Sequence, residues 1–137
     1  MLRVDRLSKA FKEALSCEEY NGYALLLVAD DGSALVSSDD SDETHTIGAA
    51  AASVFSEYKA AEKFSGAALK SYIFSSKKRK VLCKHFAILE DRGCILLVAV
   101  APDGAEITQL LELVDRASAD LSFLEPVFAN MSRRIEE

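Results

Sequence analysis

Hydrophobic residues recur along the chain with two spacings, a helical one and one typical of buried strands. Near the start, apolar side chains three or four positions apart predict an amphipathic helix over about residues 3–16. By contrast, residues 23–29 are apolar at nearly every position, so as a strand they must be covered on both faces. Turn signals separate the remaining segments. We predict strands over 33–37, 69–75, 80–89 and 94–101, a helix over about 46–63, and a last helix starting at about 102 that Pro126 kinks or ends at Glu125.

The predicted order of elements is α-β-β-α-β-β-β-α. Tight turns such as Asp30-Asp31-Gly32 favour hairpins, and therefore a mostly antiparallel sheet. Uniformly apolar strands require helices on both faces, which indicates a three-layer α/β domain. In the last helix, we expect Asp103 and Glu106 to form a capping box. We expect one buried face there, made of Ile107, Leu110, Leu111, Val114, Leu121 and Phe128.

The composition is that of an ordinary globular domain. The 137 residues predict a single domain, residues 1–137, and half of them are hydrophobic. The 16 Lys and Arg against 22 Asp and Glu give a net charge of −6, which argues against nucleic-acid binding because phosphate neutralisation needs a basic face. The longest strongly apolar run, 95–101, is too short to span a bilayer, which takes about 20 residues. With no lipidation motif either, we expect the chain to reach a membrane only through a partner.

Few side chains are suited to catalysis. Cys83 and His85 stand two apart on a predicted strand and point the same way, so they could form an activated thiol nucleophile. Alternatively, Cys83 packs as a small hydrophobe; we favour this because nothing suggests a third orienting group or a pocket. The two histidines and three scattered cysteines match no zinc spacing, and no phosphate-binding glycine motif occurs. We therefore predict no enzymatic activity, no metal and no cofactor.

Two charged segments each allow two interpretations. The acidic residues 37–44 could cap the following helix, where carboxylates complement the helix dipole, or offer oxygens to calcium. The first is favoured because the EF-hand ligand pattern is missing. The basic run Lys77-Lys78-Arg79-Lys80 could meet anionic lipid headgroups or an acidic protein surface, or form a solvated hairpin tip.

The middle helix has a wider apolar surface than one contact requires. Gly48, Ala52 and Phe55 extend its main stripe sideways, and an apolar strand, Tyr72-Ile73-Phe74, follows it. An exposed apolar helix beside an unpaired strand edge needs a partner to cover it, which favours a binding module. Alternatively, both elements are wholly internal. The main stripe contains Ile47, Ala50, Ala51, Val54, Tyr58 and Ala61.

The sequence also resembles a known family. The hairpin GYALLLVADDGSALVSSDD, the helix GAAAASVFSEY and the closing segment FLEPVF resemble the roadblock/dynein light chain superfamily. Within it, the likeness is to the late endosomal/lysosomal adaptor and MAPK and mTOR activator family, which supplies roadblock subunits of the Ragulator complex. The resemblance covers about residues 1–131.

For the fold, the resemblance implies a five-stranded antiparallel sheet with the middle helix on one face and the terminal helices on the other. It also implies that two such domains pair, with their middle helices aligned and their third strands joined edge to edge. Carried over residue by residue, the partner interface would contain Ala52, Phe55, Lys59, Tyr72 and Phe74.

For function, the resemblance implies a non-catalytic scaffold without a cofactor. Its partners would be a second roadblock subunit, a lipidated scaffold subunit and Rag-type small GTPases. The assembly would serve TOR and MAP kinase signalling on the cytoplasmic face of late endosomes and lysosomes. The alternative within the superfamily is a homodimeric dynein cargo adaptor or small-GTPase regulator, because the fold does not fix what is docked on it.

Overall fold

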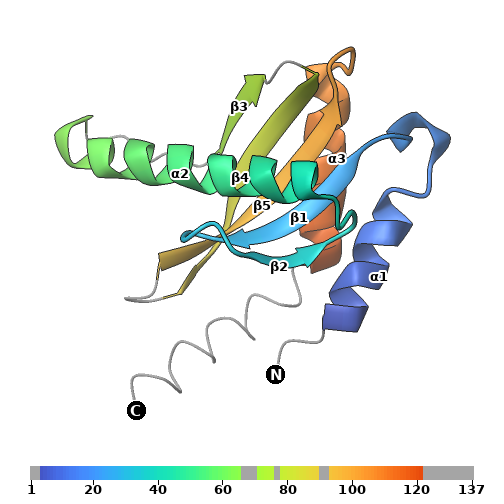
Figure 1. Cartoon of the computed structure of the whole chain (residues 1–137), viewed down its shortest axis with the longest axis horizontal. Helices are drawn as coiled ribbons and strands as arrows, with labels where there is room; N and C mark the ends of the chain where they lie inside the picture. The colour runs from blue at the N-terminus through green and yellow to red at the C-terminus, as the bar shows by residue number, and fades with distance from the viewer. Residues whose placement is uncertain (1–3, 66–70, 76–77, 90–92, 122–137) are drawn as a thin grey trace.

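The computed structural model describes residues 4–65, 71–75, 78–89 and 93–121 and has a sheet with helices on both faces (Figure 1). The predicted element order is confirmed, with one additional 3₁₀ turn. In chain order the elements are α1 (Val4–Ala14), η1 (Glu18–Tyr20), β1 (Ala24–Ala29), β2 (Ala34–Ser37), α2 (Asp42–Ser65), β3 (Ser71–Ser75), β4 (Arg79–Leu89), β5 (Gly93–Pro102) and α3 (Ile107–Leu121).

The sheet has five strands in the order β2-β1-β5-β4-β3, and every neighbouring pair is antiparallel. The predicted antiparallel sheet is therefore confirmed. The most apolar strands, β1 and β5, lie side by side, with Leu25 opposite Ala99 and Leu27 opposite Leu97. The less apolar strands β2 and β3 form the two edges.

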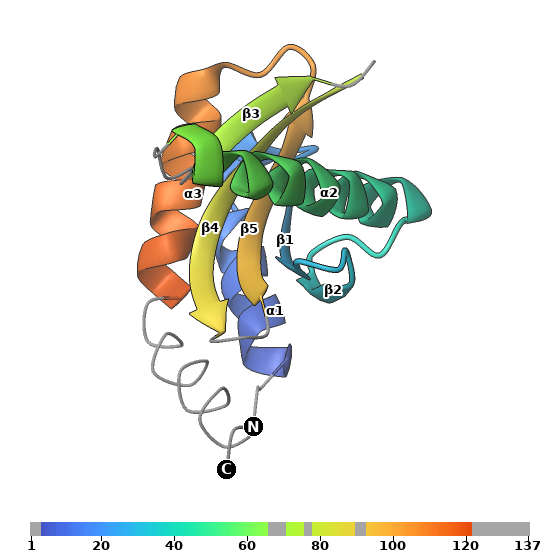
Figure 2. The ribbon, with the colours of Figure 1, turned by 90° about the vertical axis from the view of Figure 1, so that its left-hand side faces the viewer.

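Alternation along the strands creates two separate apolar cores. Successive side chains of a strand point to opposite faces, so Leu25 and Leu27 lie in one core while Leu26 and Val28 lie in the other. Figure 2 shows α2 crossing one face alone, with α1 and α3 on the opposite face. This explains why β1 and β5 contain so few polar residues: both of their faces are covered.

The two long helices begin at different residues than predicted. The middle helix, α2, starts at Asp42, four residues before the predicted position, because Ser41 caps it. The last helix starts at Ile107, later than predicted, and Asp103 does not cap it. Instead, the backbone N–H of Glu106 donates to the side-chain oxygen of Gln109 at 3.3 Å, which is half of a capping box placed three residues later.

The buried face of α3 also differs from the prediction. Leu110 and Val114 are buried as predicted, but Ile107 and Leu111 are 48% and 44% exposed. Leu113 and Ala117 are buried instead, so the apolar stripe lies further round the helix. The predicted kink at Pro126 lies outside the described residues, as does the FLEPVF segment. Among the residues described, no helix is both long and apolar enough to cross a membrane.

Candidate interaction surface

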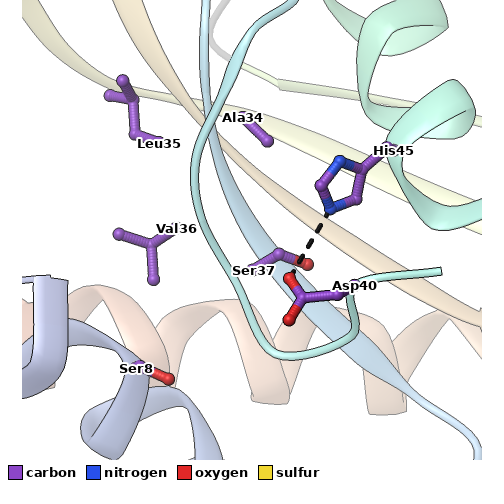
Figure 3. Close-up of a pocket in the computed structure, with 7 residues that line it drawn as sticks. All are labelled: Ser8, Ala34, Leu35, Val36, Ser37, Asp40 and His45. Carbon is purple, nitrogen blue, oxygen red and sulfur yellow. Dashed lines mark ion pairs between the residues drawn. The ribbon is translucent and has the colours of Figure 1, made fainter. Parts of the chain in front are cut away.

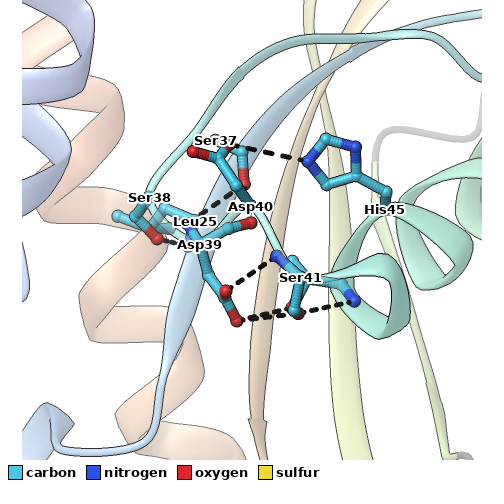
Figure 4. A network of polar contacts seen from close by, with 8 residues as sticks. Leu25, Ser37, Ser38, Asp39, Asp40, Ser41 and His45 are labelled. Atoms are coloured by element: carbon cyan, nitrogen blue, oxygen red, sulfur yellow. Dashed lines mark hydrogen bonds and ion pairs between the residues drawn. The ribbon is translucent and has the colours of Figure 1, made fainter.

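Helix α2 is anchored at its N-terminus by a local hydrogen-bond network (Figure 4). The side-chain oxygen of Ser41 accepts the backbone N–H of Thr44 at 3.3 Å, the standard N-cap bond. The carboxylate of Asp39 accepts the backbone N–H of Ser41 at 3.0 Å and the hydroxyl of Thr44 at 2.8 Å. These bonds hold the pKa of Asp39 below its usual range, and the bond from the Ser41 backbone N–H has the largest effect. The acidic segment thus contains a helix cap, as the favoured interpretation predicted.

Small residues let α2 lie close against the sheet. Gly48 is buried, and a Cβ added there would stand 3.2 Å from Leu26 Cδ2 and 3.3 Å from Val28 Cγ2. Ala51 and Phe55 continue this contact one and two turns later. The centre of the buried stripe is therefore Gly48, Ala51, Ala52 and Phe55, and not the stripe containing Ala50 and Tyr58 that the apolar pattern predicted.

The five predicted interface residues occupy two kinds of environment. Ala52 and Phe55 are 1% and 2% exposed and belong to the core beneath α2, so their side chains contact their own sheet. Lys59 is exposed, and Tyr72 and Phe74 are half-buried on β3. The role of all five in pairing stays a prediction, but only Lys59, Tyr72 and Phe74 present side-chain surface to a partner.

A row of aromatic rings joins α2 to β3. The ring centroids of Tyr58 and Tyr72 lie 6.2 Å apart, and those of Tyr72 and Phe74 lie 6.0 Å apart in a stacked arrangement. The Tyr72 hydroxyl donates to the backbone carbonyl of Ala51. Burial, and next the neighbouring Cys83 thiol, raise the pKa of Tyr72, so the hydroxyl keeps its proton and remains a donor.

The outer end of this row is exposed. Tyr58 is 55% exposed on α2, and Ile73, which points to the other face of β3, is 37% exposed. β3 pairs with β4 and is the last strand of the sheet on this side. We call the surface formed by Tyr58, Lys59, Tyr72 and Phe74, together with the outer edge of β3, the α2–β3 surface. Sequence reasoning missed Tyr58 as an exposed residue because the helical pattern placed it in the buried stripe.

The thiol–imidazole interpretation of Cys83 and His85 would require a thiol that a substrate can reach. Cys83 is completely buried beneath α2, and the register places it opposite Tyr72. The His85 ring stacks on Phe55, with centroids 5.9 Å apart. A thiol without solvent access cannot meet a substrate, so the packing interpretation of Cys83 is the one that agrees with the structure.

Part of the basic run is engaged within the chain. The guanidinium of Arg79 lies 3.3 Å from the Glu43 carboxylate, and Lys80 Nζ donates to the backbone carbonyl of Ala105 at 2.6 Å. Lys78 is exposed, and Lys77 lies outside the described residues. Two of the four cations therefore hold α2 and the β5–α3 turn in place.

This architecture is that of the roadblock/LC7 fold. A roadblock/LC7 domain from Streptomyces avermitilis superposes with a TM-score of 0.56 at 14% sequence identity, over 76% of this chain and 82% of that one. No protein-family model and no curated protein matches the sequence.

Two structures of MglB superpose over more of the chain. Myxococcus xanthus MglB gives a TM-score of 0.70 at 14% identity, covering 93% of this chain and 95% of that one. MglB solved in a tetrameric arrangement also gives 0.70, at 18% identity and 91% coverage of each chain. The shared elements thus extend over nearly the whole length of both proteins, and at this identity the likeness defines the fold.

Proposed function

We propose that this chain is a non-catalytic adaptor that works as a dimer, paired through the α2–β3 surface, and serves a small GTPase. The observation that carries the pairing is the row of exposed Tyr58 and half-buried Tyr72 and Phe74 beside β3, whose outer edge pairs with no strand in the part of the chain that the structure describes. A strand edge presents unpaired N–H and C=O groups, and monomeric domains usually protect such an edge. Edge-to-edge pairing would satisfy these groups, and the aligned α2 helices would cover the aromatic row.

In its finer form, we propose a Ragulator-like subunit. Its partner is then a second roadblock subunit, a lipidated subunit holds the pair on late endosomes or lysosomes, and the pair docks Rag-type GTPases for TOR and MAP kinase signalling. What supports this form is the sequence resemblance in the hairpin and the alanine-rich helix.

A second form is a homodimeric roadblock protein that regulates a small GTPase or carries dynein cargo. The full-length likeness to MglB, which has been solved in a tetrameric arrangement, favours self-association. The two forms differ in whether the purified chain pairs with itself, since the same surface would serve both.

The test compares two exposed apolar residues of similar exposure on opposite faces of the sheet. Tyr58→Asp places a charge on the α2–β3 surface, and we expect it to weaken dimerisation by at least about tenfold, or 1.4 kcal/mol, in sedimentation analysis. Ile107→Asp, on α3, should leave dimerisation unchanged. Circular dichroism should show both variants folded, because both side chains are about half exposed. An undiminished Tyr58→Asp dimer would contradict the proposed interface.

The Ragulator-like form and the homodimeric form are then distinguished by the proteins that co-purify with the wild-type chain. Affinity purification of the tagged chain, with mass spectrometry, should recover a second roadblock chain and Rag-type GTPases for the Ragulator-like form. Recovery of a second copy with another small GTPase, or with dynein chains, would support the homodimeric form. Tyr58→Asp should lose the paired chain in either case.

A further inference from the structure

A groove runs along the outer edge of β2, at the opposite side of the sheet from β3. It has a volume of about 220 Å³ and is lined by the four residues of β2 together with Ser8, Asp40 and His45. Figure 3 shows Leu35, Val36 and Ser8 on one side of the strand and Ala34, Ser37, Asp40 and His45 on the other. A hollow that touches side chains of both sheet faces lies along the strand edge, where one more strand would add.

The edge has backbone groups available for such a strand. Ser38 donates its backbone N–H to the Leu25 carbonyl at 2.9 Å, so at this position the chain is bonded to β1. Antiparallel pairing alternates along a strand, and the N–H and C=O of Ser37 therefore point away from β1. Within the described part of the chain, no strand pairs with this side of β2.

The two walls of the groove have different chemistry. On the α1 side stand Leu35 and Val36, consecutive residues that share a side because the β1–β2 register shifts at this point. On the α2 side the carboxylate of Asp40 is 95% exposed, 3.8 Å from His45 Nε2. Because side chains of an added strand alternate, one set would meet the apolar wall and the other would meet the carboxylate.

Charge indicates the nature of that strand. Residues 37–44, which contain Asp40 and lead from β2 into α2, have four carboxylates and no lysine or arginine, and Arg79 pairs with one of them, Glu43. A second copy of this chain would bring the same acidic segment to the same edge, and like charges repel. A basic segment would be attracted to it.

We propose that the β2 edge binds an extended peptide of another protein in which apolar residues alternate with lysine or arginine. The peptide adds as a sixth strand, its main chain bonds the outward groups of β2, its apolar side chains contact Leu35 and Val36, and its cations face Asp40. This is recognition by strand addition, in which the main chain supplies affinity and alternate side chains supply specificity. The site is separate from the α2–β3 surface and does not depend on it.

The experiment is a selection of random linear peptides, each about eight residues long, on the purified full-length chain. We expect the selected peptides to alternate apolar residues with lysine or arginine. Saturation with the strongest selected peptide should slow hydrogen exchange of the Ser37 amide at least about tenfold, since a main-chain bond protects it. Failure to select any peptide, or selection of peptides without basic residues, would overturn the proposal.

Matched variants locate the binding. Asp40→Lys should lower the affinity of the selected peptide by about tenfold or more. Asp103→Lys makes an equal charge change in the exposed β5–α3 turn and should change that affinity by less than about twofold. Ser8→Tyr, which fills the groove from α1, should lower the peptide affinity by a similar factor. Thr108→Tyr, at the exposed start of α3, should leave the affinity unchanged. Binding that survives both Asp40→Lys and Ser8→Tyr would overturn the site. Tyr58→Asp should leave this binding unchanged, so failure here is distinguishable from failure of the dimer.

Discussion

On the face of the sheet that carries Leu25 and Leu27, two amphipathic helices, α1 and α3, pack against each other and the strands, whereas α2 crosses the opposite face alone. The first core includes large side chains from both helices, such as Phe11 and Leu110. The second depends on a helix whose contact residues are mostly glycine and alanine, with Phe55 as its one large, fully buried side chain among the described residues.

The difference separates the part of the fold that stabilises the single chain from the part that leaves apolar surface for the proposed pairing. The two-helix face covers its strands, so its apolar residues stabilise the single chain. The single helix α2 lies close to the sheet but leaves Tyr72 and Phe74 half-buried and Tyr58 exposed. A second molecule would bury that remainder, and we therefore propose the interface on the α2 side.

The strongest test of the comparison removes one phenylalanine from each face. Phe11→Ala and Phe55→Ala should each lower the free energy of unfolding by about 3–5 kcal/mol, because both rings are buried and each deletion leaves a cavity. Chemical denaturation measures this loss. If the alanine variants do not fold, the milder Phe11→Leu and Phe55→Leu allow the same comparison of unfolding free energies between the two faces.

Phe55 distinguishes the sequence interpretation from the structure. The resemblance places its ring against a partner, whereas the structure buries the ring in the chain's own core. If Phe55→Ala costs less than about 1 kcal/mol in the isolated chain while Phe11→Ala costs several, the ring faces a partner and not the core. That result would contradict the burial seen in the structure.

The close approach of α2 can be tested at Gly48. Gly48→Val should lower the free energy of unfolding by about 1–3 kcal/mol, because the added atoms meet Leu26 and Val28 at a packed contact. The control is Gly104→Val, since a Cβ at Gly104 meets nothing within 4 Å. Thermal and chemical denaturation of the two variants should differ clearly. Equal losses would mean that α2 stands further from the sheet.

The cap of α2 has a smaller expected effect. Ser41→Ala removes the acceptor for the Thr44 N–H and should lower the free energy of unfolding by about 1 kcal/mol. Ser53→Ala, an exposed serine within α2, should change it by less than about 0.5 kcal/mol because alanine is the better helix former. A cap variant as stable as this control would show that α2 does not depend on Ser41.

The strands and their order along the chain were predictable, because β1 and β5 are covered on both faces and their apolar runs are continuous. The buried face of α2 was not predictable. Alanines occur on several sides of this helix, so its apolar pattern does not indicate which side packs against the sheet. Gly48 could be identified as a contact only once β1 was placed beneath it.

The relations among the site residues also divide into those that the sequence predicts and those that it does not. Tyr72 and Phe74 share a strand face by simple alternation, which the sequence contains. That Tyr72 stands opposite Cys83 depends on the β3–β4 register, and that its hydroxyl reaches Ala51 depends on where α2 crosses. Neither relation can be derived from spacing along the chain.

The smallest predicted effect is a pH dependence at the start of α2. Hydrogen bonds from the Ser41 N–H and then the Thr44 hydroxyl lower the pKa of Asp39 in the folded chain. In the unfolded chain that carboxylate has its ordinary pKa of about 3.9, so below this pH the unfolded state takes up its proton first. The stability that Asp39 contributes is therefore complete above about pH 3.9 and is lost as pH falls through the lower folded pKa.

Denaturation of wild type and Asp39→Asn at pH 5, 4, 3 and 2 measures this contribution, with Asp103→Asn as the control for a carboxylate removed elsewhere on the surface. The wild type should exceed Asp39→Asn by less than about 1 kcal/mol at pH 5, because Asp39 is exposed and solvent screens it. The excess should shrink toward pH 2. An excess that stays constant with pH would mean that the Asp39 bonds do not favour its charged form, and the cap would then rest on Ser41 alone.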